Sequence, residues 1–194
     1  MENFGRILDR MRVSGMTVPA QTVQIKTENA KVILRNAFDC FLALENRKTI
    51  WIDSYSEVAK WLENNEGKGL LLYGDCGQGK SLLSRFILPA ILLQYHNKVV
   101  TSFDVQEMNT RLDAVLMKKI VSLDDIGTEA MINDFGNKRM AFAEIVDQAE
   151  KKGKLLIIST NLNKDKLIEM YGERVFDRLC KLTKRILFTG KSMR

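Results

Sequence analysis

The chain has 194 residues, of which 45% are hydrophobic and 28% charged, proportions typical of one soluble α/β domain with a short appendage. No apolar run approaches the about 20 residues that a membrane helix needs, and the first residues lack a signal-peptide core. Three isolated cysteines and a single histidine match no metal-ligand spacing, which argues against zinc chemistry and favours reduced thiols in a cytoplasmic protein.

The net charge is +6, from 30 basic and 24 acidic side chains, and it is unevenly distributed. Residues 1–66 carry nine side chains of each sign, so the whole excess lies in residues 67–194. This distribution favours a polyanionic partner, although a solvated basic face that only aids solubility explains it equally well.

The first third of the sequence predicts helices joined by a linker. Residues 4–11 suit a short helix, and residues 28–46 place apolar side chains at helical spacing. That apolar face could pack on the rest of the protein or dock a partner helix. A capping box at residues 54–57 predicts the start of another helix. We therefore expect residues 1–66 to form an N-terminal helical extension that serves as linker and candidate partner-binding segment.

A phosphate-binding motif stands at the start of the second part, residues 67–194. Residues 74–81 read G-x-x-x-x-G-K-S, after an apolar stretch that suits a buried strand and before a stretch that suits a helix. Glycines let consecutive N–H groups point at an anion, and the helix N-terminus adds partial positive charge. Lys80 would reach the β- and γ-phosphates, and Ser81 would bind Mg²⁺. The expected nucleotide contacts are Gly74, Asp75, Cys76, Gly77, Gln78, Gly79, Lys80, Ser81 and Leu82.

The remaining sequence alternates strand and helix patterns. Pro89 predicts that the helix after the phosphate loop either kinks or ends near residue 88. The expected strands are residues 69–73, 98–103, 120–123, 154–160 and 186–188; the expected helices include residues 104–117, 137–151, a short one capped by Asn163, and 173–182. This alternation predicts an α/β fold, a three-layer α/β/α sandwich with a mostly parallel five-stranded sheet.

Polar residues follow two of these strands and would complete the site. Asp124 and Asp125 end an apolar strand about 40 residues after the phosphate loop. In a parallel sheet the carboxyl ends of the strands gather at one edge, so Asp124 would hold Mg²⁺ beside Ser81. Asp125 would orient the attacking water, and Asn161 would contact the γ-phosphate from the next strand end. Ser122 is unusual in its apolar strand, because a buried hydroxyl needs a partner.

Two arginines, Arg174 and Arg178, are separated by one helical turn, so both are expected on one helix face. An arginine supplied by a neighbouring subunit can stabilise the charge that develops on a γ-phosphate. The alternative is salt bridging within the chain, which is as plausible as catalysis for Arg178 and less so for Arg174.

These motifs together resemble the AAA+ helicase-loader family, the DnaC-like and IstB-like ATPases. The likeness covers about residues 67–194 and is carried by the phosphate loop, by Leu123–Gly127, by Ser159–Leu162, by the arginine block 172–179 and by the closing G-K-S-M-R of residues 190–194. It implies a P-loop NTPase of the AAA+ (ASCE) type without the C-terminal helical lid of most AAA+ proteins. It also implies that Lys80, Asp125, Asn161, Arg174 and Arg178 are catalytic, with Asn161 as the first sensor and Arg174 or Arg178 acting in trans.

The resemblance implies an ATPase that uses ATP and Mg²⁺ to load or recruit a replicative helicase on single-stranded DNA, with weak activity alone and stimulation by its partner or DNA. The alternative is an IstB-like helper of a DNA transposase; a small-molecule kinase is a third reading, in which Arg174 has no role. DNA contacts are expected from Arg111, Lys118 and Lys119, and would be to phosphates because no aromatic side chains interleave them. Self-association is expected if Arg174 serves a neighbouring nucleotide.

Overall fold

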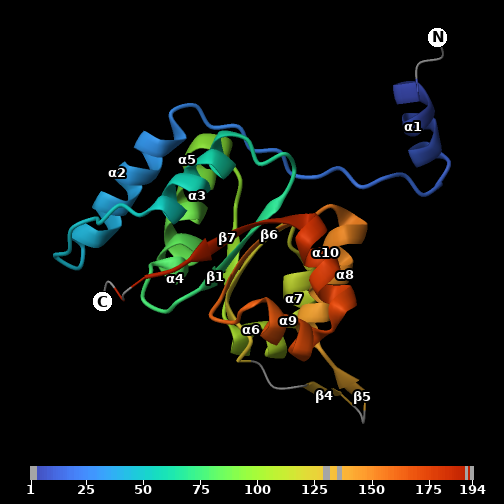
Figure 1. The fold of residues 1–194 in the computed structure, drawn as a ribbon. Helices are drawn as coiled ribbons and strands as arrows, with labels where there is room; N and C mark the ends of the chain where they lie inside the picture. Colours follow the sequence, from blue (N-terminus) through green and yellow to red (C-terminus); the bar gives the residue numbers. More distant parts are fainter. Residues whose placement is uncertain (1–3, 129–131, 135–136, 191, 193–194) are drawn as a thin grey trace.

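The protein is built on one sheet of five parallel strands in the order β2-β3-β6-β1-β7 (Figure 1). The computed structural model describes residues 4–128, 132–134, 137–190 and 192. The strands of the sheet are β1 (Gly69–Gly74), β2 (Thr101–Phe103), β3 (Ile120–Ile126), β6 (Leu155–Thr160) and β7 (Thr183–Phe188). The five predicted strands and the α/β class are confirmed, and every strand pair in this sheet is parallel.

Helices cover both faces of the sheet and give the predicted three layers (Figure 1). One face carries α2 (Ala30–Ala43), α3 (Asp53–Glu63), α4 (Lys80–Leu82), the π-helical segment η1 (Leu83–Ile87) and α5 (Leu88–His96). The other carries α6 (Val105–Thr110), α7 (Leu112–Met117), α8 (Ala141–Lys152), α9 (Lys164–Tyr171) and α10 (Glu173–Leu182). A small hairpin of β4 (Ile132–Asp134) and β5 (Asn137–Arg139) projects beyond β3. In the part of the chain that the structure describes, no helix is long and apolar enough to cross a membrane, and none follows β7.

Successive side chains along a strand point to opposite faces of the sheet and belong to two separate hydrophobic clusters. In β1, Leu70 and Leu72 join the cluster beneath α2, α3 and α5, whereas Leu71 joins the cluster beneath α8 and α10. This alternation explains why the predicted strands are apolar along their whole length, since a sheet covered on both sides has no solvent face.

Packing continues across residue 66. Val23, Ile25, Phe38 and Trp61 belong to the same buried cluster as Leu70, and the side-chain oxygen of Asn65 accepts a hydrogen bond of 2.8 Å from the Ile25 N–H. By contrast, α1 (Phe4–Val13) stands apart from the layers at the end of an extended segment (Figure 1). The partner-binding role of residues 1–66 stays a prediction, and α1 is the part of them that lies outside the core.

A proline and a serine explain the irregular helix after the phosphate loop. The Leu88 N–H donates to the Leu83 carbonyl, five residues back. If this five-residue spacing continued, the N–H of residue 89 would donate to the Ser84 carbonyl, but Pro89 has no N–H. The Ser122 hydroxyl of β3 donates to this carbonyl at 2.7 Å, with both serines fully buried. The sequence predicts that this helix either kinks or ends near residue 88, and the structure changes there from η1, which ends at Ile87, to α5, which begins at Leu88. Ser122 fills the hydrogen-bonding gap that Pro89 leaves.

Replacing Ser122 with Ala should lower the free energy of unfolding by about 1–3 kcal/mol, because the buried Ser84 carbonyl would lose its donor. Ser102, which pairs with Ser122 from the neighbouring strand β2, provides a matched control. Ser102→Ala should change stability by less than about 0.5 kcal/mol. Urea unfolding of both variants measures the difference; equal effects would show that the Ser84 carbonyl does not depend on Ser122.

Three local predictions about helices were wrong. The capping box at residues 54–57 does not form, because α3 begins at Asp53 and the Ser54 hydroxyl donates instead to the Leu187 carbonyl at 2.8 Å. The helix predicted over 137–151 begins only at Ala141, since residues 137–139 pair with β4. The helix predicted over 104–117 is interrupted at Arg111. The expected caps at Asp104 and Asn163 are both present.

Candidate nucleotide-binding site

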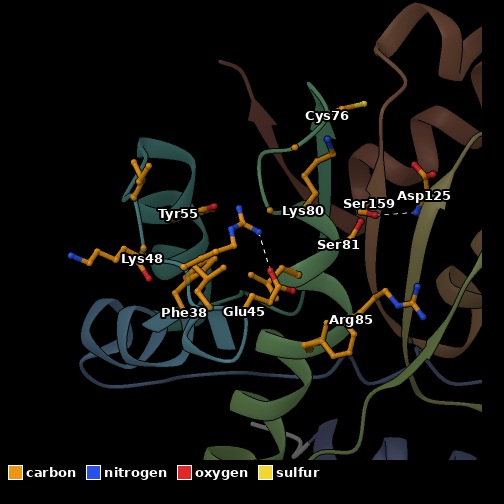
Figure 2. Close-up of a pocket in the computed structure, with 18 of the residues that line it drawn as sticks. Phe38, Glu45, Lys48, Tyr55, Cys76, Lys80, Ser81, Arg85, Asp125 and Ser159 are labelled. Atoms are coloured by element: carbon orange, nitrogen blue, oxygen red, sulfur yellow. Dashed lines mark hydrogen bonds and ion pairs between the residues drawn. The ribbon is translucent and has the colours of Figure 1, made fainter. Parts of the chain in front are cut away.

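A pocket of about 690 Å³ opens at the carboxyl ends of β1, β3 and β6, between the phosphate loop and α2–α3 (Figure 2). The loop side is formed by Cys76, Gly77 and Gly79–Leu82, and the strand side by Asp125, Ser159 and Asn161. The third wall comes from residues 38–55, including Phe38, Arg47, Ile50 and Tyr55. The strand-end residues predicted from separate motifs therefore meet at one site.

The phosphate loop has the conformation that its glycines allow. It turns directly from β1 into α4, and Gly74, Gly77 and Gly79 have φ angles of 115°, 77° and 79°, which residues with a Cβ rarely adopt. A Cβ at Gly79 would lie 2.7 Å from the Tyr55 hydroxyl, which donates to the Gln78 carbonyl at 3.1 Å. The loop is thus packed closely against α3.

Lys80 is the centre of the hydrogen-bonding network. Its buried ammonium group donates to the carbonyls of Gly74 (2.8 Å) and Asp75 (2.7 Å) and to the Asn161 side-chain oxygen (2.9 Å). The Asn161 amide nitrogen in turn donates to an Asp125 carboxylate oxygen at 2.7 Å. Three of the predicted catalytic residues therefore form one continuous chain from the phosphate loop through β6 to β3.

Burial lowers the pKa of Lys80 below its usual value of 10.5, and the nearby acidic groups oppose this only in part. Because phosphate binding needs the charged ammonium, nucleotide affinity should fall by about ten- to hundred-fold as the pH rises through this lowered pKa. Folding stability should change in the opposite direction. Between the lowered folded pKa of Lys80 and its unfolded pKa, the unfolded state binds more protons, so the free energy of unfolding rises with pH. Calorimetric titration from pH 7.5 to 10 measures the loss of affinity, and Lys80→Met should show no such dependence.

Asp124 is held by hydroxyl groups beneath the pocket. Its Oδ1 accepts hydrogen bonds from Ser84 (3.1 Å) and Ser159, whereas its Oδ2 lies 3.8 Å from the Arg85 guanidinium. A carboxylate and the Ser81 hydroxyl are oxygen ligands of the kind that Mg²⁺ uses together with phosphates and water. Within the described residues no group of three His, Cys, Asp or Glu side chains could hold a metal ion.

Arg85 would compete with a metal ion bound at the Asp124 carboxylate, although its side chain is 41% exposed and the ion pair is weak. Arg85→Gln should therefore raise the Mg²⁺ affinity of the nucleotide-bound protein by roughly two- to five-fold. Arg185→Gln, which removes an exposed charge on β7, is the control. A Mg²⁺ titration in the presence of ATP measures the effect; a lower affinity in Arg85→Gln would mean that Arg85 helps to hold the triphosphate.

Asp125 differs from Asp124 in both backbone and exposure. Its φ of 58° is left-handed, its N–H donates to the Ser159 hydroxyl at 3.0 Å, and its carboxylate faces the pocket (Figure 2). The backbone turn at this residue separates the two adjacent carboxylates, so that one is buried and the other is accessible to a reacting group.

The two candidate arginines on α10 differ in their surroundings, and neither lines the pocket of its own chain. Arg178 pairs with Asp147 (2.7 Å) and Glu150 (2.9 Å) of α8, and its side chain is only 22% exposed. Arg174 is exposed, and no ion pair or hydrogen bond involves its side chain within the described part of the chain. Salt bridging, one of the two alternatives for Arg178, is therefore present, and Arg174 is the arginine available to a neighbouring molecule.

The residues predicted to contact DNA lie away from the phosphate loop. Lys118 and Lys119 precede β3 at the opposite edge of the sheet, beside a hollow of about 700 Å³ that Lys98 also lines. The Lys119 ammonium donates to the carbonyls of Gln21 (3.0 Å) and Lys152 (2.7 Å), so it has a structural role at the end of α8. Arg111 is exposed at the break between α6 and α7. Binding of DNA by these residues stays a prediction.

Sequence patterns alone missed several parts of the site. Ser84 and Ser159 hold Asp124, and the only signal for them was a polar residue in an apolar helix or strand. Burial raises the pKa of Tyr55 to about 12, which keeps its hydroxyl protonated as the donor to the phosphate loop. Residues 38–55 carry no nucleotide-binding motif, so only the folded chain identifies them as a wall of the pocket.

Comparison with known proteins gives one curated relative. No family model matches the chain. The chain is 26% identical over 173 residues to the replicative helicase loader DnaI of Bacillus subtilis (strain 168), and the match covers 79% of this chain and 52% of DnaI. The chain thus spans about half the length of this curated relative.

Solved structures share the fold. The DnaC helicase loader superposes with a TM-score of 0.60 at 21% identity, covering 73% of this chain and 93% of that chain. DnaI gives 0.53 at 24% identity over 66% and 73% of the two chains, and AMPPCP-bound DnaA from Aquifex aeolicus gives 0.53 at 14% identity over 74% and 50%. At these identities the structures show the fold alone, which is the AAA+ P-loop fold. With the curated relative, they confirm that the chain resembles the DnaC-like helicase-loader family of AAA+ proteins.

Proposed function

We propose that this protein is an AAA+ ATPase that binds ATP with Mg²⁺ and loads or recruits a replicative DNA helicase on single-stranded DNA. The observation that carries the ATPase is the hydrogen-bonded chain from Lys80 through Asn161 to Asp125 at the mouth of the pocket. The helicase assignment is supported by the sequence similarity to a replicative helicase loader.

The chemistry assigns a role to each member of the site. The amides of the phosphate loop and the Lys80 ammonium bind the β- and γ-phosphates, and Lys80 exchanges its two backbone carbonyl partners for phosphate oxygens. Ser81 and Asp124 would hold Mg²⁺, which would neutralise charge on the phosphate oxygens. Asp125 orients a water and accepts its proton as the water oxygen bonds to the γ-phosphorus and the bond to the leaving ADP breaks, and Asn161 fixes the Asp125 carboxylate.

The site of one chain lacks an arginine at the γ-phosphate from α10, because Arg174 lies outside its own pocket. We propose that Arg174 completes the pocket of a neighbouring subunit, so that hydrolysis depends on self-association on DNA or on the helicase ring. Arg178 then holds α10 against α8 through Asp147 and Glu150 and thereby supports the position of Arg174.

The helicase-binding element is best assigned to α1. Residues 23–66 contribute many side chains to the core and the pocket wall, whereas α1 lies outside the layers, where it exposes Leu8 and carries Arg6, Arg10 and Arg12. Removing residues 1–16 should abolish helicase binding and leave ATP affinity unchanged. A loss of both would place the partner surface on the ATPase core.

Two measurements test the function. Purification of the tagged protein from its own cells should recover a replicative helicase; recovery of a transposase would instead support the transposition-helper alternative. ATP turnover should be slow for the protein alone and faster with helicase or single-stranded DNA, and the stimulation by DNA should decrease with salt because phosphate contacts release counterions. Absence of nucleotide binding would refute the proposal, and transfer of phosphate to a nucleoside would indicate a kinase.

A further inference from the structure

The last residue of β7 and the segment after it lie against the phosphate loop and form two hydrogen bonds with one of its residues, Asp75. The Asp75 N–H donates to the Phe188 carbonyl at 2.8 Å, and the Gly190 N–H donates to the Asp75 carboxylate at 3.0 Å. Asp75 is separated from Gly190 by 115 residues, so these bonds join two distant parts of the chain at the edge of the nucleotide pocket. Figure 1 shows β7 ending beside α4, where the loop enters its helix.

A second contact lies two residues further along each segment. A Cβ at Gly77 would lie 2.1 Å from the Ser192 hydroxyl oxygen and 3.1 Å from the Ser192 Cα, so the loop and the segment touch without space for a side chain. A Cβ at Gly190 would lie 3.5 Å from the Gln78 side-chain nitrogen, and Gln78 is 2% exposed although it belongs to a loop. Gly190 and Ser192 therefore contact the loop at Asp75 and Gly77.

We infer that Gly190 and Ser192 are part of the nucleotide site, where they act as a strap that holds the phosphate loop in the shape that binds a triphosphate. The inference rests on the proposed ATP binding. A loop with three glycines in left-handed conformations is costly to order, and a contact that orders it before the ligand arrives increases affinity. Asp75 and Gly190 are positioning residues, because they act through the loop amides. Lys191, Met193 and Arg194 of the same predicted motif lie outside the described residues.

The Asp75 charge allows a test of the strap, because the strap and simple charge repulsion predict opposite changes in ATP affinity when this charge is removed. Burial lowers the pKa of Lys80, and the Asp75 charge is one of those that oppose this shift, so the Asp75 charge acts on the group expected to bind the phosphates. Without a strap, removing this negative charge should strengthen ATP binding, since like charges repel. With the strap, removing the carboxylate releases Gly190 and should weaken ATP binding.

The experiment compares Asp75→Ala with Asp75→Asn by calorimetric titration of ATP. The alanine variant should bind ATP roughly three- to ten-fold more weakly than the parent, as expected for one lost hydrogen bond. The asparagine variant keeps an acceptor oxygen for the Gly190 N–H and should bind at least as well as the parent. Thr189→Ala is the control and should leave affinity unchanged, because Thr189 is an exposed neighbour whose side chain forms no hydrogen bond with the described residues of the loop. Tighter or unchanged binding by Asp75→Ala would overturn the inference.

A double-mutant cycle with Gly190→Pro gives an independent readout. Proline has no N–H and cannot adopt the Gly190 φ of 136°, so it should detach the segment. In that background Asp75→Ala should have no further weakening effect; additive losses would refute a shared contact. If Gly190→Pro does not fold, the Asp75 pair decides alone.

Hydrogen exchange without nucleotide separates this inference from the proposed function. The amides of residues 74–80 should exchange faster in Gly190→Pro than in the parent whether or not ATP is the ligand. If the exchange difference is present but the parent does not bind ATP, the proposed function alone is refuted. Unchanged exchange in a protein that binds ATP would refute the strap alone.

Discussion

Replacing Asp125 with Asn is expected to lower ATP turnover by about 10²–10⁴-fold while ATP affinity stays within about two-fold of the parent. An amide cannot accept the proton of the attacking water, but its oxygen can still accept the hydrogen bond that the Asn161 amide donates to Asp125 at 2.7 Å. Asn is also the side chain that best tolerates the left-handed φ of 58° at this position, so the fold should be retained. Single-turnover hydrolysis and calorimetric binding measure the two effects separately.

Asp124→Asn provides the matched control, because the two residues are adjacent but differ in surroundings. Asp124 is buried and held by Ser84 and Ser159, so its replacement should weaken the Mg²⁺ dependence of binding as well as turnover. The assignment of Asp125 would be wrong if Asp125→Asn lost nucleotide affinity and turnover in equal measure, since that pattern belongs to a residue that holds the ground state.

Much of this site could be predicted from the sequence because topology converts order along the chain into position in space. Parallel strands place their carboxyl ends at one edge, so a motif after β1, an acidic pair in β3 and an asparagine after β6 had to converge. Lys80, Asp125 and Asn161 are joined by hydrogen bonds as this rule requires.

The features that could not be predicted depend on contacts between distant residues. Ser54 has the local sequence of a cap, but its hydroxyl bonds to Leu187, which is 133 residues away. Ser122 looked anomalous until the missing N–H of Pro89 on a different layer explained it. The pocket wall from residues 38–55 carries no periodic or motif signal for a ligand, since its position results from packing in the core shared with β1.

Arg174→Ala is expected to leave ATP binding intact and to lower turnover by up to about 10³-fold, because a trans arginine acts on charge that develops only in the transition state. Its side chain is exposed and does not line the nucleotide pocket of its own chain, so the variant should fold and bind nucleotide like the parent. Arg178→Ala is the contrast, since it leaves Asp147 and Glu150 of α8 without their shared partner. That variant should lower thermal stability as well as turnover.

Mixing two inactive proteins distinguishes action in trans from action in cis. Lys80→Ala loses the ammonium that binds the phosphates but keeps Arg174, whereas Arg174→Ala keeps an intact pocket. In a mixed assembly, Arg174 of the first protein can reach the nucleotide of the second, so turnover should recover in proportion to the number of mixed neighbours. The recovery should disappear on dilution below the dissociation constant of the assembly, because the completed site spans two chains. If the mixture stays inactive under conditions where the parent assembles and hydrolyses ATP, Arg174 acts within its own chain, and the site does not need a second copy.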